Sequence, residues 1–110
     1  MVIPKTFEDS GDFESLILTS VLGTLTALDK DLISMEQAES YWFSPFTRDI
    51  FRQLGMSDQL IGIIDDGIIL KSLYSQEDMF RKELADLITR TEQLIETHYT
   101  NYNEFDALVS

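Results

Sequence analysis

The chain has 110 residues, of which 20 are acidic and 8 basic, and its formal net charge is −12. A negative field of this strength repels nucleic-acid phosphates and anionic lipid surfaces, so neither nucleic-acid binding nor membrane binding is expected. Hydrophobic residues make up 44% of the chain, which is enough for the core of one domain and excludes an acidic disordered chain. Cysteine is absent, so neither a disulfide framework nor a thiolate zinc site can form.

The first helix is predicted over residues 12–28, where hydrophobic residues recur every three or four positions. Ser10 or Asp12 is its predicted N-cap, and Asp12 and Glu14 lie where the helix dipole favours negative charge. The predicted core stripe consists of Phe13, Leu16, Ile17, Val21, Leu22, Leu25 and Leu28.

Two shorter helices are expected next. Ser34 is the predicted N-cap of a helix that ends near Trp42, because Gln37 follows it at the spacing of a capping box. Ser44 is the predicted cap of a third helix, with proline at the first helical position, where its missing N–H costs nothing. Gly55 is predicted to end this helix in the left-handed conformation.

The second half of the chain predicts two more helical regions. Ser57 is the predicted cap of a fourth helix, which residues 65–67 (Asp-Asp-Gly) are expected to end or bend. Residues 68–70 fit a strand or a helix, and we favour a short helix because no other segment offers a partner strand. Ser75 is the predicted cap of the last long helix, which ends near Thr97.

These segments predict an all-α fold, a compact irregular array of about five helices whose core lies between the first and last long helices. The domain is expected to span residues 1–110, with residues 1–9 and 99–110 as terminal segments that are either mobile or docked. The N-terminal residues lack the basic region and apolar run of a signal peptide, and no apolar stretch reaches the roughly 20 residues of a membrane span. We therefore expect a cytoplasmic protein.

The residue types present do not predict catalysis. His98 is the only histidine, and we expect it to be a surface residue near a helix end, where an imidazolium is favoured. Asp29 and Asp31 resemble the start of a calcium loop, but the apolar residues that follow break the pattern of oxygen ligands. The glycines lack the spacing of phosphate-binding loops. The chain is therefore predicted to be no enzyme, with neither cofactor nor metal.

Two regions are candidates for binding a partner. Residues 41–46 form an aromatic cluster at a helix junction, which is either core or a partly exposed anchor. After Arg90 the chain has four acids and no lysine or arginine, with aromatic residues between the acids. Charge of this kind steers a basic partner and aromatic rings anchor it. The predicted partner-binding residues are Asp65, Asp66, Glu92, Glu96, Tyr99, Tyr102, Glu104 and Asp106.

A resemblance makes the functional hypothesis more specific. Residues 18–28 (LTSVLGTLTAL), 32–39 (LISMEQAE) and 43–46 (FSPF) resemble small acidic bacterial proteins of unknown function. Those proteins look like ones encoded beside secreted antibacterial toxins, including the immunity proteins of contact-dependent inhibition and polymorphic toxin systems. The resemblance covers residues 16–46 and implies a protein that binds and neutralises a toxin. It carries over no individual binding residue.

The leading hypothesis is therefore an immunity protein that blocks the active site of a cationic antibacterial toxin. A nuclease is the favoured toxin, because its basic cleft binds a polyanion and dense carboxylates can mimic phosphate. The alternative is a non-enzymatic acidic adaptor or regulator that docks a basic cellular protein. A homodimer built on the helices is a further option. The gene neighbourhood would separate a toxin from a cellular partner.

Overall fold

The computed structural model describes the backbone of residues 10–109 and the side chains of residues 13–99. Five helices follow one another in this part of the chain: α1 (Ser10–Asp29), α2 (Met35–Tyr41), α3 (Pro45–Gln53), α4 (Asp58–Leu73) and α5 (Glu77–Val109). The described backbone contains no strand, so the prediction of an all-α fold is confirmed. The predicted terminal segment 1–9 lies outside the described residues.

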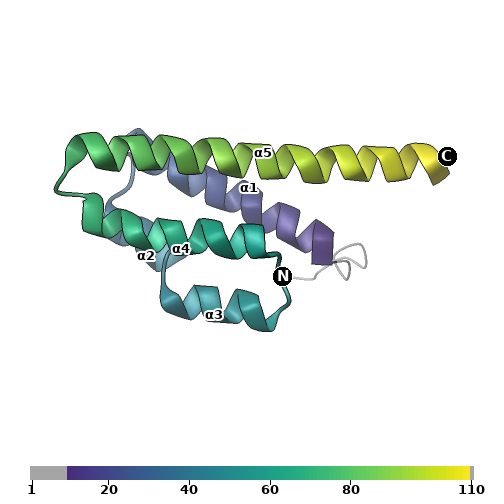
Figure 1. The fold of residues 1–110 in the computed structure, drawn as a ribbon, viewed down its shortest axis with the longest axis horizontal. Helices are drawn as coiled ribbons and strands as arrows, with labels where there is room; N and C mark the ends of the chain where they lie inside the picture. The colour runs from purple at the N-terminus through teal and green to yellow at the C-terminus, as the bar shows by residue number, and fades with distance from the viewer. Residues whose placement is uncertain (1–9, 110) are drawn as a thin grey trace.

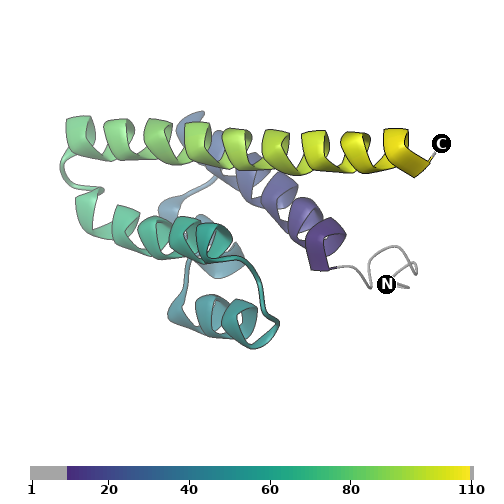
Figure 2. The same ribbon diagram turned by 45° about the vertical axis from the view of Figure 1, so that its right-hand side comes forward.

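The long helix α5 organises the molecule. Both α1 and α4 run antiparallel to it, and α3 lies on the side of α4 that faces away from α5 (Figures 1 and 2). The pair α1 and α5 makes the most extensive contact of any two helices, as predicted for the first and last long helices. At a rise of about 1.5 Å per residue, the 33 residues of α5 span about 50 Å. This length accounts for the 51 Å long axis of the molecule, and the C-terminal part of α5 projects past the other helices.

The polar residues that delimit the short helices behave as predicted. The Ser34 hydroxyl accepts from the backbone N–H of Gln37, whose side chain accepts from the Ser34 N–H, which completes the capping box. Ser44 caps α3 and Ser57 caps α4 in the same way. Gly55 adopts a φ of +74°, the left-handed conformation expected after α3.

Three predicted helix boundaries are wrong. The helix α1 begins at Ser10, so Ser10 and Asp12 both lie inside it and neither is the N-cap. The last helix begins at Glu77, because its first backbone hydrogen bond runs from Phe80 to Gln76, which leaves Ser75 outside the cap position. It also continues past the predicted end near Thr97 to Val109, since no glycine or proline follows position 67 to interrupt it.

The predicted break at residues 65–67 is also absent. The helix α4 runs through this segment and includes Ile68–Leu70, which confirms helix over strand there. Gly67 is buried against the ring of Phe43, and a Cβ atom at this position would overlap that ring. Glycine therefore serves close packing between α4 and the α2–α3 junction and does not end the helix.

The core stripe of α1 differs from the prediction at three positions. Leu18 is fully buried although it was not predicted, whereas Leu16 is exposed and Leu22 is half-buried. The remaining members of the observed stripe are Ile17, Val21, Leu25 and Leu28, and α5 presents Phe80, Leu84, Leu87 and Thr91 to them. The stripe is narrower than predicted because α1 faces mainly one neighbour, α5.

Candidate functional site

The most buried polar cluster joins three parts of the fold through Glu14. This α1 side chain is only 4% exposed, and its carboxylate accepts hydrogen bonds from three donors. The Ser57 backbone N–H lies 2.6 Å away and the Ser57 hydroxyl 2.8 Å away. The third partner is Nε2 of His98 on α5, at 2.8 Å. The carboxylate also lies at the positive N-terminal end of the α4 dipole, which favours its charge.

This cluster has the residue types of a nucleophilic triad in a different order. A triad places histidine between the nucleophile and the acid, so that the imidazole can take the nucleophile's proton. Here the acid lies in the middle, and the Ser57 hydroxyl donates to Glu14 while it accepts from the Leu60 N–H as the α4 cap. The geometry therefore indicates a structural junction among α1, α4 and α5.

His98 does not occupy the predicted position. Because α5 continues to Val109, His98 lies within the helix, and its ring points to the buried Glu14. The prediction of a surface histidine at a helix end is therefore wrong. Asp29 and Asp31 also have an intramolecular role, since the Arg81 guanidinium binds the Asp29 carbonyl at 2.7 Å and the Asp31 carboxylate at 3.0 Å. Among the residues described, no group of three or more acidic or histidine side chains could hold a metal ion.

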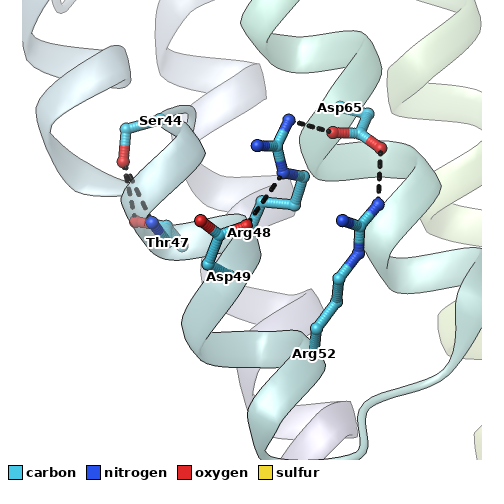
Figure 3. Close-up of polar contacts among 6 residues, drawn as sticks. All are labelled: Ser44, Thr47, Arg48, Asp49, Arg52 and Asp65. Carbon is cyan, nitrogen blue, oxygen red and sulfur yellow. Dashed lines mark hydrogen bonds and ion pairs between the residues drawn. The ribbon is translucent and has the colours of Figure 1, made fainter.

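Asp65, a predicted partner-binding residue, lies at the contact between α3 and α4. Its carboxylate accepts from Arg48 at 3.3 Å and faces Arg52 at 3.9 Å, as Figure 3 shows. Arg48 also binds the neighbouring Asp49 at 3.3 Å. The hydrogen bonds to Asp65 and Asp49 raise the pKa of the Arg48 guanidinium above its ordinary value. These ion pairs attach α3 to α4.

Asp66, the neighbouring candidate, holds α4 to α5. Its carboxylate accepts from Arg90 at 2.6 Å, and Asp86 lies 3.6 Å from the same guanidinium. The hydrogen bond to Asp66 raises the pKa of the Arg90 guanidinium above its ordinary value. Both predicted aspartates are therefore engaged within the chain.

The other described candidates share one exposed face of α5. Glu92, Glu96 and Tyr99 are spaced four and three residues apart, which places them on the same side of a helix. Tyr99 is 65% exposed, and neither glutamate forms an ion pair with any side chain that the structure describes. Tyr102, Glu104 and Asp106 belong to α5 by their backbone, but their side chains lie outside the described residues.

The aromatic cluster at residues 41–46 contains both core and surface residues. Phe43 is buried against Gly67, and the half-buried Trp42 donates its indole N–H to Thr24 at 3.1 Å. Tyr41 and Phe46 are exposed. Phe43 therefore belongs to the core, whereas Tyr41 and Phe46 are the exposed aromatic residues of this cluster.

The chain matches the family described as "Protein of unknown function (DUF3969)" over residues 8–108, and it belongs to that family. No curated protein and no solved structure matches it significantly. The family description assigns no activity, so the resemblance to immunity proteins stays a prediction. Across residues 10–109, none of the helices combines the length and the apolar character needed to cross a membrane.

Proposed function

We propose that this member of a family of unknown function is a non-enzymatic inhibitor that binds a cationic antibacterial toxin and blocks its active site. The proposal rests on the resemblance of residues 16–46 to immunity proteins and on one structural observation. That observation is the exposed face of α5 formed by Glu92, Glu96 and Tyr99, which we call the acidic ridge.

The pairing of the basic residues supports this choice of surface. Arg48, Arg52, Lys71, Arg81 and Arg90 each lie within 4 Å of a carboxylate of the same chain. The positive charges of the described part are thus largely used to hold helices together. A basic partner that approaches the acidic ridge therefore meets carboxylates that are free to bind it.

The position of the ridge also suits a cleft. The C-terminal part of α5 that projects beyond the other helices (Figure 1) follows directly after the ridge, because His98 still contacts Glu14 of α1. A helix with side chains is about 10–12 Å wide, so the end of a single projecting helix is a narrow element that can enter a cleft. In this arrangement Glu92 and Glu96 replace substrate phosphates, and Tyr99 supplies the anchoring ring. The predicted contacts Tyr102, Glu104 and Asp106 lie further along the same projecting helix.

The direct test asks whether the protein captures a basic toxin and protects cells from it. Tagged protein from the native host should retain a basic protein encoded next to it, and co-expression should protect cells from that protein's toxicity. Capture of a basic cellular protein without any protective effect would favour the adaptor alternative. Failure to recover any basic protein, together with no protection, would refute the proposal.

The surface is tested with two variants of equal charge. The ridge variant combines Glu92→Gln with Glu96→Gln. The control variant combines Glu77→Gln with Glu83→Gln at the other end of α5, so each variant removes two negative charges. The ridge variant should slow association with the captured toxin by about tenfold at low salt, and the control should change it far less. Added salt should slow association of the native chain. Equal effects of the two variants would show that only net charge matters, which would refute the assignment of the ridge.

A further inference from the structure

The outward surface of α3 is apolar although the chain is strongly acidic. Phe46 is 75% exposed, Ile50 36% and Leu54 53%. Their spacing of four residues places them along one side of the helix, and we call this set the α3 stripe. The helix α3 itself lies on the side of the molecule that faces away from α5 (Figure 2). Large apolar side chains aligned at the surface are typical of an interaction site.

The α3 stripe is held rigidly by contacts on the opposite side of the helix. Phe51 is buried, Ser44 caps the N-terminus, and Arg48 and Arg52 bind Asp65 of α4 (Figure 3). The stripe is therefore preorganised, and a partner that covers it need not order the helix first.

The charge around α3 indicates what this partner is. Residues 44–57 contain two arginines and one aspartate, a net charge of +1 in a chain of −12. With Asp65 included, two positive and two negative charges balance locally. Two copies of an acidic protein repel each other least where their facing surfaces are neutral and apolar. A second copy of this chain fits the stripe better than a cationic partner, because the stripe offers a cation no unpaired carboxylate.

The spacing of the stripe is self-complementary. If two α3 helices pack antiparallel about a two-fold axis at Ile50, Phe46 of each copy faces Leu54 of the other. A two-fold interface requires this reciprocity, in which residue i meets j and j meets i. We propose that the α3 stripe pairs with the same stripe of a second copy to form an antiparallel two-fold dimer. Three side chains per copy bury less than the about 800 Å² per partner of standard interfaces, so the dimer should dissociate on dilution.

Sedimentation velocity over a concentration series tests the proposal. The mass should rise from 12.7 kDa towards twice that value. High salt should promote dimerisation, because it screens the repulsion between two negatively charged copies. Toxin binding through the acidic ridge should respond to salt in the opposite direction, so failure of one proposal is distinguishable from failure of the other. A chain that stays monomeric at all concentrations and salt conditions would overturn the dimer.

Substitutions at the axis make the test specific. Ile50→Glu places two like charges opposite each other and should weaken the dimer by about tenfold or more. Ile69→Glu, at an exposed position on α4, is the matched control and should leave the dimer intact. A 1:1 mixture of Ile50→Glu and Ile50→Lys chains should associate more tightly than Ile50→Glu alone. Circular dichroism should verify that each variant folds, and equal dimerisation of the Ile50→Glu and Ile69→Glu chains would overturn the proposal.

The absence of cysteine allows a second, independent measurement. An Ile50→Cys chain should form a disulfide-linked dimer about tenfold faster than an Ile69→Cys chain at equal concentration, because pairing at the axis raises the local thiol concentration. Equal cross-linking rates for the two variants would contradict the antiparallel two-fold arrangement.

Discussion

Replacing Glu14 with alanine should lower the free energy of unfolding by about 3 kcal/mol. Hydrogen bonds to ionised groups contribute about 1.5–3 kcal/mol each, and the buried carboxylate accepts from two Ser57 donors and from His98. The loss should be smaller than the sum of these values, because Ser57 and His98 are half-buried and recover some hydration. The variant nevertheless removes a carboxylate that contacts both the start of α4 and α5 from α1.

A double-mutant cycle isolates the contact between helices α1 and α5. Glu14→Ala, His98→Ala and the double variant should be compared by urea unfolding, followed by far-ultraviolet circular dichroism. The coupling energy between the two side chains should be about 1 kcal/mol. Glu83→Ala, at an exposed site on α5, is the control and should change stability by less than about 0.5 kcal/mol. A coupling energy near zero, or a Glu14→Ala loss no larger than the control, would refute the junction.

Two pairs of substitutions test the packing. Gly67→Ala should destabilise the fold by about 1–3 kcal/mol, because its Cβ atom would overlap the ring of Phe43. Gly23→Ala should instead stabilise α1 by about 0.5–1 kcal/mol, because the added Cβ atom meets open space. Leu87→Ala should cost about 2–5 kcal/mol at a fully buried position, and Leu22→Ala should cost less than half of that because it is half-buried. Urea unfolding measures all four, and equal effects within either pair would contradict the packing described.

Much of the helical pattern follows from local chemistry that the sequence displays. Ser34, Ser44 and Ser57 each bond a backbone N–H three residues ahead, and Gly55 adopts the left-handed conformation expected after α3. These contacts involve residues within one turn of the chain, so residue type and spacing are sufficient to predict them. The failed predictions at residues 65–67 and in the core stripe of α1, in contrast, concern contacts with residues that are distant in the chain.

The role of the acidic segment at residues 65–67 required the tertiary structure. Local propensity reads Asp-Asp-Gly as a helix end. The packing of Phe43 against Gly67 and the arginines supplied by α3 and α5 allow the helix to continue. Neither contact can be inferred from the segment itself. For the same reason the sequence could propose Asp65 and Asp66 as partner contacts, although both carboxylates hold other helices in place.

The junction at Glu14 could have been predicted from the spacing of residues, although not from net charge or helix propensity alone. Glu14 lies three and four residues before the buried Ile17 and Leu18, and His98 continues the buried series of Leu87 and Thr91. A charged residue in register with a core stripe must find a polar partner once it is buried. The sequence thus determines the helices, the caps Ser34, Ser44 and Ser57, and the net charge. Which polar residues meet inside, and which apolar residues remain outside, is decided by how the helices pack, because those contacts join residues up to 84 positions apart.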